Sequence, residues 1–166
     1  MEVKKVVWAS VLGALSVVID VAFKNIVPLE TMGTPYYAIP IIIASIFLGP
    51  KYSISIAFLG DLISVLLSPF PYLPIFSLGS LMWGLIPGFL LKDKYSFKNI
   101  ILVVFLTHIL VTSINSLALY VHYHKSVQAL LIDLPLRSLL IIPNTIIISL
   151  LVEGVLEPIK IKRGII

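Results

Sequence analysis

Long apolar runs separated by short polar breaks dominate the pattern along the chain. The runs cover residues 6–23, 36–48, 51–67, 75–91, 99–121 and 129–157. A helix that crosses the hydrocarbon core of a bilayer needs about 20 mostly apolar residues. Inside lipid, a helix also satisfies its backbone hydrogen bonds within its own segment. The pattern therefore predicts an all-α integral membrane protein, a bundle of about six transmembrane helices.

The breaks between the runs carry recognisable turn signals. Gly49-Pro50 predicts a tight turn between the second and third runs. Three prolines within residues 68–74 exclude a regular helix there. The sixth run contains Pro135 and Pro143, so we expect that helix to be interrupted at both positions.

Composition agrees with a membrane environment and narrows the chemistry. Hydrophobic residues make up 59% of the 166 residues and charged residues 12%, which is about half the charged fraction of a soluble domain. Six spans leave no room for a separate soluble domain, so residues 1–166 are predicted to form a single transmembrane domain. The absence of cysteine excludes disulfides, thiol catalysis and cysteine-based metal sites.

The basic residues predict the orientation of the bundle in the membrane. If both termini lie on the same side, nine of the twelve Lys and Arg residues fall on that side: Lys4, Lys5, Lys51, Lys92, Lys94, Lys98, Lys160, Lys162 and Arg163. Short cytoplasmic loops are enriched in Lys and Arg. We therefore expect both termini in the cytoplasm. The net charge of +4 is explained in this way, and no nucleic-acid partner is expected.

Polar residues within the spans gather toward the predicted outer side. Asp61 lies well inside the third run, where a carboxylate costs about 3 kcal/mol unless it is paired or hydrated. It could contact a ligand, bond a neighbouring helix, or pair with Arg137. Arg137 in turn could face an outer cavity or pair with Asp133, four residues earlier. Asn115 could contact a ligand or bond another helix.

Aromatic residues complete a predicted pocket that opens to the outside. Tyr72 lies between prolines that restrict its backbone, and Phe76 and Tyr123 belong to the same side. A cluster of polar and aromatic side chains at one end of a small bundle is typical of a ligand site. By contrast, Tyr36 and Tyr37 are predicted to be ordinary residues of the membrane interface.

Two small residues on the first run, Ala9 and Gly13, are four positions apart. Such a pair lets another helix approach closely. The neighbouring helix could belong to a partner protein or to the same bundle.

The sequence gives little support for a catalytic site or a metal site. His122 and His124 are two positions apart and point to different sides of a helix. No cysteine or His-Glu-x-x-His pattern completes a ligand set, so neither a metal site nor a cofactor is expected. Asp61 and His108 are predicted at different depths, which argues against an intramembrane enzyme.

A stand-alone small carrier stays open as an alternative function, although such a carrier would usually show inverted repeats or a polar path across the membrane.

Several stretches together resemble one family of membrane proteins. They are Leu48-Gly49-Pro50 through Gly60-Asp61-Leu62, Pro71 through Leu78, Gly84-Leu85-Ile86-Pro87-Gly88, Ile114-Asn115-Ser116-Leu117, Tyr123, Leu134-Pro135-Leu136-Arg137 and Pro143. With them the chain resembles the substrate-binding S component of energy-coupling factor (ECF) vitamin importers, and within these the folate type. Three positions depart from the family: Gly13 replaces a usual alanine, Ala118 a frequent tryptophan of the folate type, and His124 a common glycine.

The resemblance implies a multi-pass vitamin-binding subunit of a prokaryotic plasma membrane, without an ATPase of its own. It would deliver its ligand together with a transmembrane coupling protein and two cytoplasmic ATPases. The expected ligand is folate, with thiamin, pantothenate, riboflavin or pyridoxine as alternatives. The expected substrate-binding residues are Asp61, Tyr72, Phe76, Asn115, Tyr123 and Arg137. Ala9 and Gly13 are expected to face the coupling protein.

Overall fold

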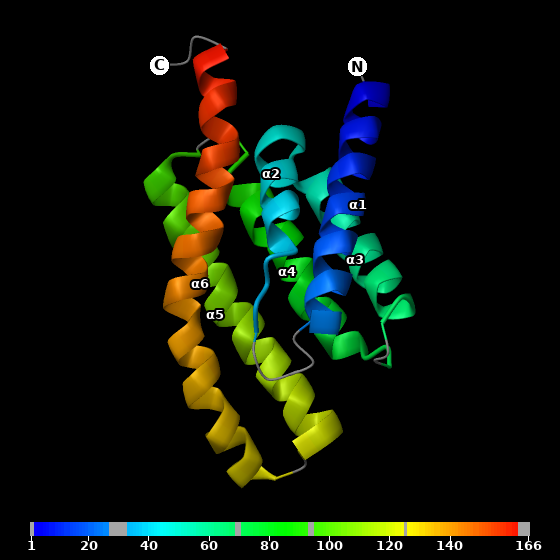
Figure 1. The fold of residues 1–166 in the computed structure, drawn as a ribbon, viewed down its shortest axis with the longest axis vertical. Coiled ribbons are helices and arrows are strands. Elements are labelled where there is room, and N and C mark those ends of the chain that lie inside the picture. Colours follow the sequence, from blue (N-terminus) through cyan, green and yellow to red (C-terminus); the bar gives the residue numbers. More distant parts are fainter. Residues whose placement is uncertain (1, 27–32, 69–70, 93–94, 125, 163–166) are drawn as a thin grey trace.

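The fold is helical throughout the part of the chain that the structure, a computed structural model, describes: residues 2–26, 33–68, 71–92, 95–124 and 126–162. These ranges contain six α-helices, one short π-helical segment and no strand (Figure 1). The elements are α1 (Glu2–Ile26), α2 (Ala38–Leu48), α3 (Pro50–Leu66), α4 (Pro74–Leu90), α5 (Phe97–Leu119), η1 (Tyr120–His124) and α6 (Val127–Lys162). The predicted all-α membrane bundle is confirmed.

The helices differ in their ability to cross a bilayer. Three segments in the described ranges are long and apolar enough to do so: Glu2–Ile26, Phe97–His122 and Leu134–Pro158. Helices α3 and α4 have 17 residues each, whereas α2 has only 11. Eleven residues span about 16 Å, roughly half of the hydrocarbon thickness. Helix α2 therefore cannot cross alone, and the chain before it must supply the rest of the path.

Helix α2 lies in the interior of the bundle, and eight of its 11 residues are buried. Residues 33–37 lead into it as non-helical chain whose backbone needs hydrogen-bond partners at this depth. The Ser16 hydroxyl of α1 donates to the Tyr37 carbonyl at 2.8 Å. The Asn144 side-chain amide of α6 donates to the Gly33 carbonyl at 2.9 Å. These two buried polar side chains hold the entry to α2 from opposite sides.

The turn between α2 and α3 is formed as the sequence predicts. Gly49 has a φ of 85°, a backbone conformation that side-chain-bearing residues rarely adopt. Its amide donates to the carbonyls of Ala44 and Ser45, which closes the end of α2. Pro50 follows at the first position of α3, where its missing N–H has no cost. Helix α3 therefore runs back beside α2.

Helices α3 and α4 approach each other closely through glycines on α4. A Cβ atom at Gly84 would lie 2.5 Å from the Ser53 carbonyl oxygen, and one at Gly88 would lie 2.8 Å from the Pro50 Cα. The Ser53 hydroxyl donates to the Gly84 carbonyl at 2.7 Å across the same contact. These contacts fix the register between α3 and α4.

The prediction that the last helix is interrupted was wrong. Helix α6 runs for 36 residues and contains Pro135, Pro143 and Pro158. A proline in a membrane helix is tolerated where local adjustments and neighbouring groups satisfy the freed carbonyl. Pro135 and Pro143 lie on the exposed side of α6, so their rings do not interfere with packing against α5.

Both ends of the described chain lie at the same end of the bundle, and the α5–η1–α6 hairpin forms the opposite end (Figure 1). The start of α3 lies toward the end that carries the termini (Figure 1), and the Lys92 side chain, just after α4, lies against Gly49 at that turn. The predicted orientation, with the termini in the cytoplasm and the hairpin outside, requires this arrangement, and the end that carries the hairpin is accordingly called the outer end.

Candidate functional site

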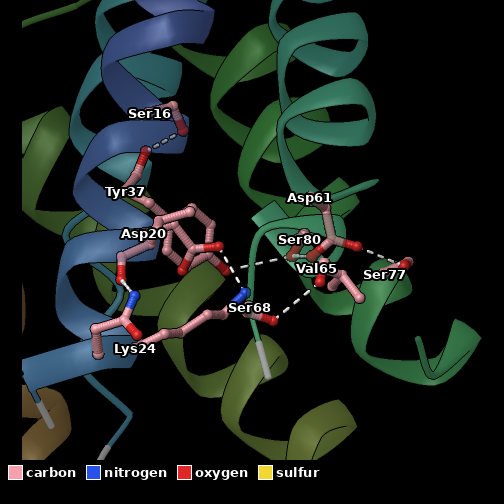
Figure 2. A network of polar contacts seen from close by, with 11 residues as sticks. Ser16, Asp20, Lys24, Tyr37, Asp61, Val65, Ser68, Ser77 and Ser80 are labelled. Atoms are coloured by element: carbon pink, nitrogen blue, oxygen red, sulfur yellow. Dashed lines mark hydrogen bonds and ion pairs between the residues drawn. The ribbon is translucent and has the colours of Figure 1, made fainter. Parts of the chain in front are cut away.

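Asp61 of α3 is held by two serine hydroxyls of α4 (Figure 2). Ser77 donates to Oδ2 at 2.5 Å and Ser80 donates to Oδ1 at 2.8 Å. A carboxylate has about four lone-pair positions, so each oxygen can still accept another hydrogen bond. The serines orient the carboxylate and leave half of its acceptor capacity for a further partner.

The sequence left open an ion pair between Asp61 and Arg137. Within the described part of the chain, Asp61 takes its hydrogen bonds from serines and forms no ion pair with Arg137. Arg137 lies on α6 and is buried. The side chain of Asp133, its alternative partner, lies outside the described residues. The two charged residues of the predicted site are therefore both inside the bundle, but on different helices and not joined to each other.

Tyr37 extends the Asp61 network to two further helices. Its hydroxyl lies 3.4 Å from the Ser80 hydroxyl, and its carbonyl accepts the hydrogen bond from Ser16 of α1. Figure 2 shows the Tyr37 side chain between α1, which carries Asp20, and α3, which carries Asp61. The prediction of an ordinary interfacial residue was wrong for Tyr37. Its position beside an apolar run gave no signal that the ring turns inward.

Tyr36 also points into the protein. Its hydroxyl donates to Asn144 Oδ1 at 3.0 Å, and its ring packs edge-on against Phe23, with ring centroids 5.0 Å apart. Asn144 thus uses both polar atoms of its side chain to hold residues 33–37. The interfacial assignment of Tyr36 was wrong for the same reason as that of Tyr37, because the non-helical chain before α2 is inside the bundle.

A second carboxylate lies near this network and is neutralised. Asp20 of α1 pairs with Lys24 one turn later, at 2.7 Å between Oδ2 and Nζ. The Asp20 side chain is 12% exposed and the Lys24 side chain 28% exposed. Asp20 is therefore paired with the Lys24 ammonium group, whereas Asp61 accepts hydrogen bonds from the hydroxyls of Ser77 and Ser80.

Asn115 of α5 lies on the opposite side of α4, at the level of the two serines. A Cβ atom at Gly79 would lie 2.5 Å from Asn115 Oδ1, so the side chain occupies the space that this glycine leaves. Oδ1 is buried and has no hydrogen-bond partner among the described residues. Because Gly79 stands between Ser77 and Ser80, Asp61 and Asn115 lie at a similar depth. The structure thus brings together two of the predicted site residues around the outer half of α4.

Of the three predicted aromatic site residues, the structure describes the side chains of two. Tyr72 is 45% exposed and precedes α4, and Phe76 is half-buried in the first turn of that helix. Both lie within five residues of Ser77, at the outer end of α4. The Tyr123 side chain lies outside the described residues. Tyr72 and Phe76 are therefore near the Asp61 network, and among the described residues no side-chain hydrogen bond joins them to it.

The small residues of α1 face α3. A Cβ atom at Gly13 would lie 3.8 Å from the Ile56 side chain, and Ala9 packs against the hydrophobic core. The exposed side of the same helix carries Val7, Val11 and Val18, with Ala14 among them. Of the two readings of the small pair, packing within the bundle is the one that these contacts favour.

Comparison with protein families identifies the family of this chain. The model of the family described as the ECF transporter, substrate-specific component, matches residues 4–158, nearly the whole chain. The chain belongs to this family. Comparison with curated proteins and with solved structures gives no significant match.

Membership of the ECF family establishes the general role of the chain. ECF substrate-specific components are transporter subunits rather than enzymes, and they work with a coupling protein and ATPases. The chain is accordingly a multi-pass membrane subunit that confers substrate specificity on an ECF transporter. The family match does not distinguish one substrate from another, so the substrate has to be argued from the side chains.

Proposed function

We propose that this ECF component captures folate from outside the cell and delivers it across the prokaryotic plasma membrane, together with a coupling protein and two ATPases. The observation that carries the choice of substrate is the Asp61 carboxylate, oriented by Ser77 and Ser80 in the outer half of the bundle. A pterin ring presents adjacent N–H donors along one edge. Two donors side by side match the two oxygens of a carboxylate in a bidentate pair.

Three other residues would complete the recognition of folate. Asn115 Oδ1, an acceptor without a partner among the described residues, would take a further N–H group. Arg137 would supply a planar donor for a ring oxygen or for the glutamate carboxylates of the ligand. Tyr72 and Phe76 would cover the ring face, where stacking adds about 1 kcal/mol beyond area burial. Tyr123 is proposed to line the same site.

The test of this proposal is a calorimetric titration of the purified protein in detergent with folate, thiamin, riboflavin, pantothenate and pyridoxine. We expect folate to bind tightly and the other four vitamins to give no heat of binding. Tight binding of another vitamin without binding of folate would reject the proposed substrate and leave the family unaffected. A small molecule that co-purifies with the protein, identified by mass spectrometry, would give the same answer independently.

We further propose that α1 is the helix that contacts the coupling protein. It is the least covered of the three long spans: 11% of its most apolar stretch is buried, compared with 39% for each of the other two spans. Because Gly13 faces Ile56, the exposed contact would centre on Ala14 rather than on the predicted pair Ala9 and Gly13. A small residue there lets a partner helix approach closely.

Two substitutions distinguish the role of the exposed face of α1 from that of the face that packs against α3. Ala14→Leu should block uptake by cells that contain the whole transporter, and it should leave the affinity of the purified subunit for its ligand unchanged. Gly13→Leu should lower the thermal stability of the purified subunit, because the added side chain meets Ile56. If Ala14→Leu transported normally while Gly13→Leu remained stable and blocked uptake, the coupling face would include Gly13, as the sequence predicts.

A further inference from the structure

A crevice lies between the outer ends of α5 and α6, and no residue of the Asp61 network lines it. It has a volume of about 270 Å³ and is lined by Ser113, Ser116, Leu117, Tyr120 and Leu134. Its walls are almost entirely apolar. Ligand sites for drug-sized molecules usually measure about 300–1,000 Å³, so this space suits a slender apolar group.

The crevice opens on the side of α5 that faces lipid. Exposed apolar residues form a stripe along this helix and continue past the crevice: Leu102, Leu106, Ile109, Leu110, Leu117 and Val121. The apolar span of α5 ends at His122. Tyr120 therefore lies at the outer boundary of the hydrocarbon core, with Ser116 one turn deeper. The crevice is a gap in a lipid-facing surface, at the depth where acyl chains join their headgroups.

Two of the residues beside the crevice, Ser116 and Tyr120, carry hydroxyl groups. Ser116 is 6% exposed, and its Oγ has no hydrogen-bond partner among the described residues. By contrast, Ser113 donates to the carbonyl of Ile109, the usual arrangement for serine in a membrane helix. Tyr120 adds a phenolic hydroxyl and begins the π-helical segment η1. A wider π turn locally replaces the regular helix here, as often occurs at functional sites.

We propose that this crevice binds one acyl chain of an outer-leaflet glycerolipid, whose ester oxygens accept hydrogen bonds from Ser116 and Tyr120. The apolar walls match the chain, and the buried Ser116 hydroxyl without a partner is costly unless a molecule bound in the crevice supplies an acceptor. The ester group is the acceptor that a glycerolipid places next to its acyl chains. The bound chain would seal α5 against α6 at the outer side of the bundle.

Photocrosslinking from the lipid tests this proposal. The full chain is reconstituted in vesicles of phosphatidylethanolamine and phosphatidylglycerol that contain a small fraction of phosphatidylglycerol with a diazirine near the ester end of one acyl chain. After illumination, adducts are mapped by peptide mass spectrometry. We expect severalfold more adduct on residues 113–120 and 134 than on Leu102 and Leu106 of the same exposed stripe.

Three variants make the test specific. Ser113→Phe, which fills the crevice, should abolish the excess and leave labelling at Leu102 and Leu106 unchanged. Ser55→Phe is the matched control, because Ser55 is also exposed and its hydroxyl also bonds to its own helix, at 2.9 Å from the Lys51 carbonyl. The double variant Ser116→Ala/Tyr120→Phe removes both hydroxyls without filling the space and should lower the excess severalfold.

Two outcomes would overturn the proposal. Equal labelling along the whole stripe in the unmodified protein would mean that only the general lipid shell is present. Loss of the excess on addition of folate or another vitamin that binds the protein would mean that the crevice belongs to the substrate site. Neither outcome decides the proposed choice of folate, because that choice is argued from Asp61 and is tested separately by the binding titration.

Discussion

Replacing Asp61 by asparagine is expected to weaken folate binding at least about tenfold and to leave the protein folded, because a buried charged partner contributes about 2–5 kcal/mol. Asparagine has nearly the same size and keeps one oxygen that can accept from Ser77 or Ser80. It loses the negative charge and the second acceptor, and its NH₂ group would face the N–H donors of the ligand. The loss should therefore appear in affinity rather than in stability.

Isothermal titration of the purified variants with folate measures this effect. Asp20→Asn is the matched control, because Asp20 is a carboxylate of the same outer region that is already paired with Lys24. We expect it to change the affinity by much less than Asp61→Asn does. If the folded Asp61→Asn protein bound folate normally, Asp61 would be a helix-packing residue, whose role is confined to its bonds with Ser77 and Ser80.

The helices could be predicted from the sequence because the bilayer imposes a strong constraint. Lipid offers no hydrogen bonds, so each span must form a helix of a certain length, and every break is marked by charge, glycine or proline. Gly49-Pro50 illustrates this, since both the positive φ and the helix start are encoded in two residues. Prolines within a span are a weaker signal, and α6 continues through three of them.

The inward-facing tyrosines could not be predicted for a related reason. A tyrosine at the edge of an apolar run usually marks the membrane interface. Here, α2 is too short to span, and residues 33–37 continue its path inside the bundle. The positions of Tyr36 and Tyr37 follow from their contacts with Asn144, Ser16 and Ser80, which come from three other helices. No local pattern contains this information.

The candidate site was only half predictable. Asp61 and Asn115 stand out as polar residues within spans, and the structure places both beside the outer half of α4. Ser77 and Ser80 do not stand out, because serine is common in membrane helices and usually bonds to its own backbone. Their role depends on the register between α3 and α4, which is set more than one turn away by the glycine contacts.

The register itself leads to the second large expected effect, that of Gly84→Ala. Glycine to alanine within a helix normally stabilises by about 0.5–1 kcal/mol. At Gly84 the sign should reverse, because the new Cβ would lie 2.5 Å from the Ser53 carbonyl oxygen and 2.8 Å from the Ile54 Cα. Backbone atoms cannot rotate away as a side chain can, so α3 and α4 must separate. Overpacking of this kind typically costs about 1–3 kcal/mol.

Separation of the two helices should also reach the site. Ser77 and Ser80 are one to two turns from Gly84 on the same helix, so a shift of α4 lengthens their bonds to Asp61. Thermal unfolding in detergent, followed by the fluorescence of the buried Trp83, measures stability, and titration with folate measures binding. Gly154→Ala on α6 is the control, because nothing lies within 4 Å of its added Cβ, and it should be neutral or stabilising. A Gly84→Ala protein as stable as the Gly154→Ala protein, with unchanged affinity, would show that the contact between α3 and α4 does not hold Asp61 in place.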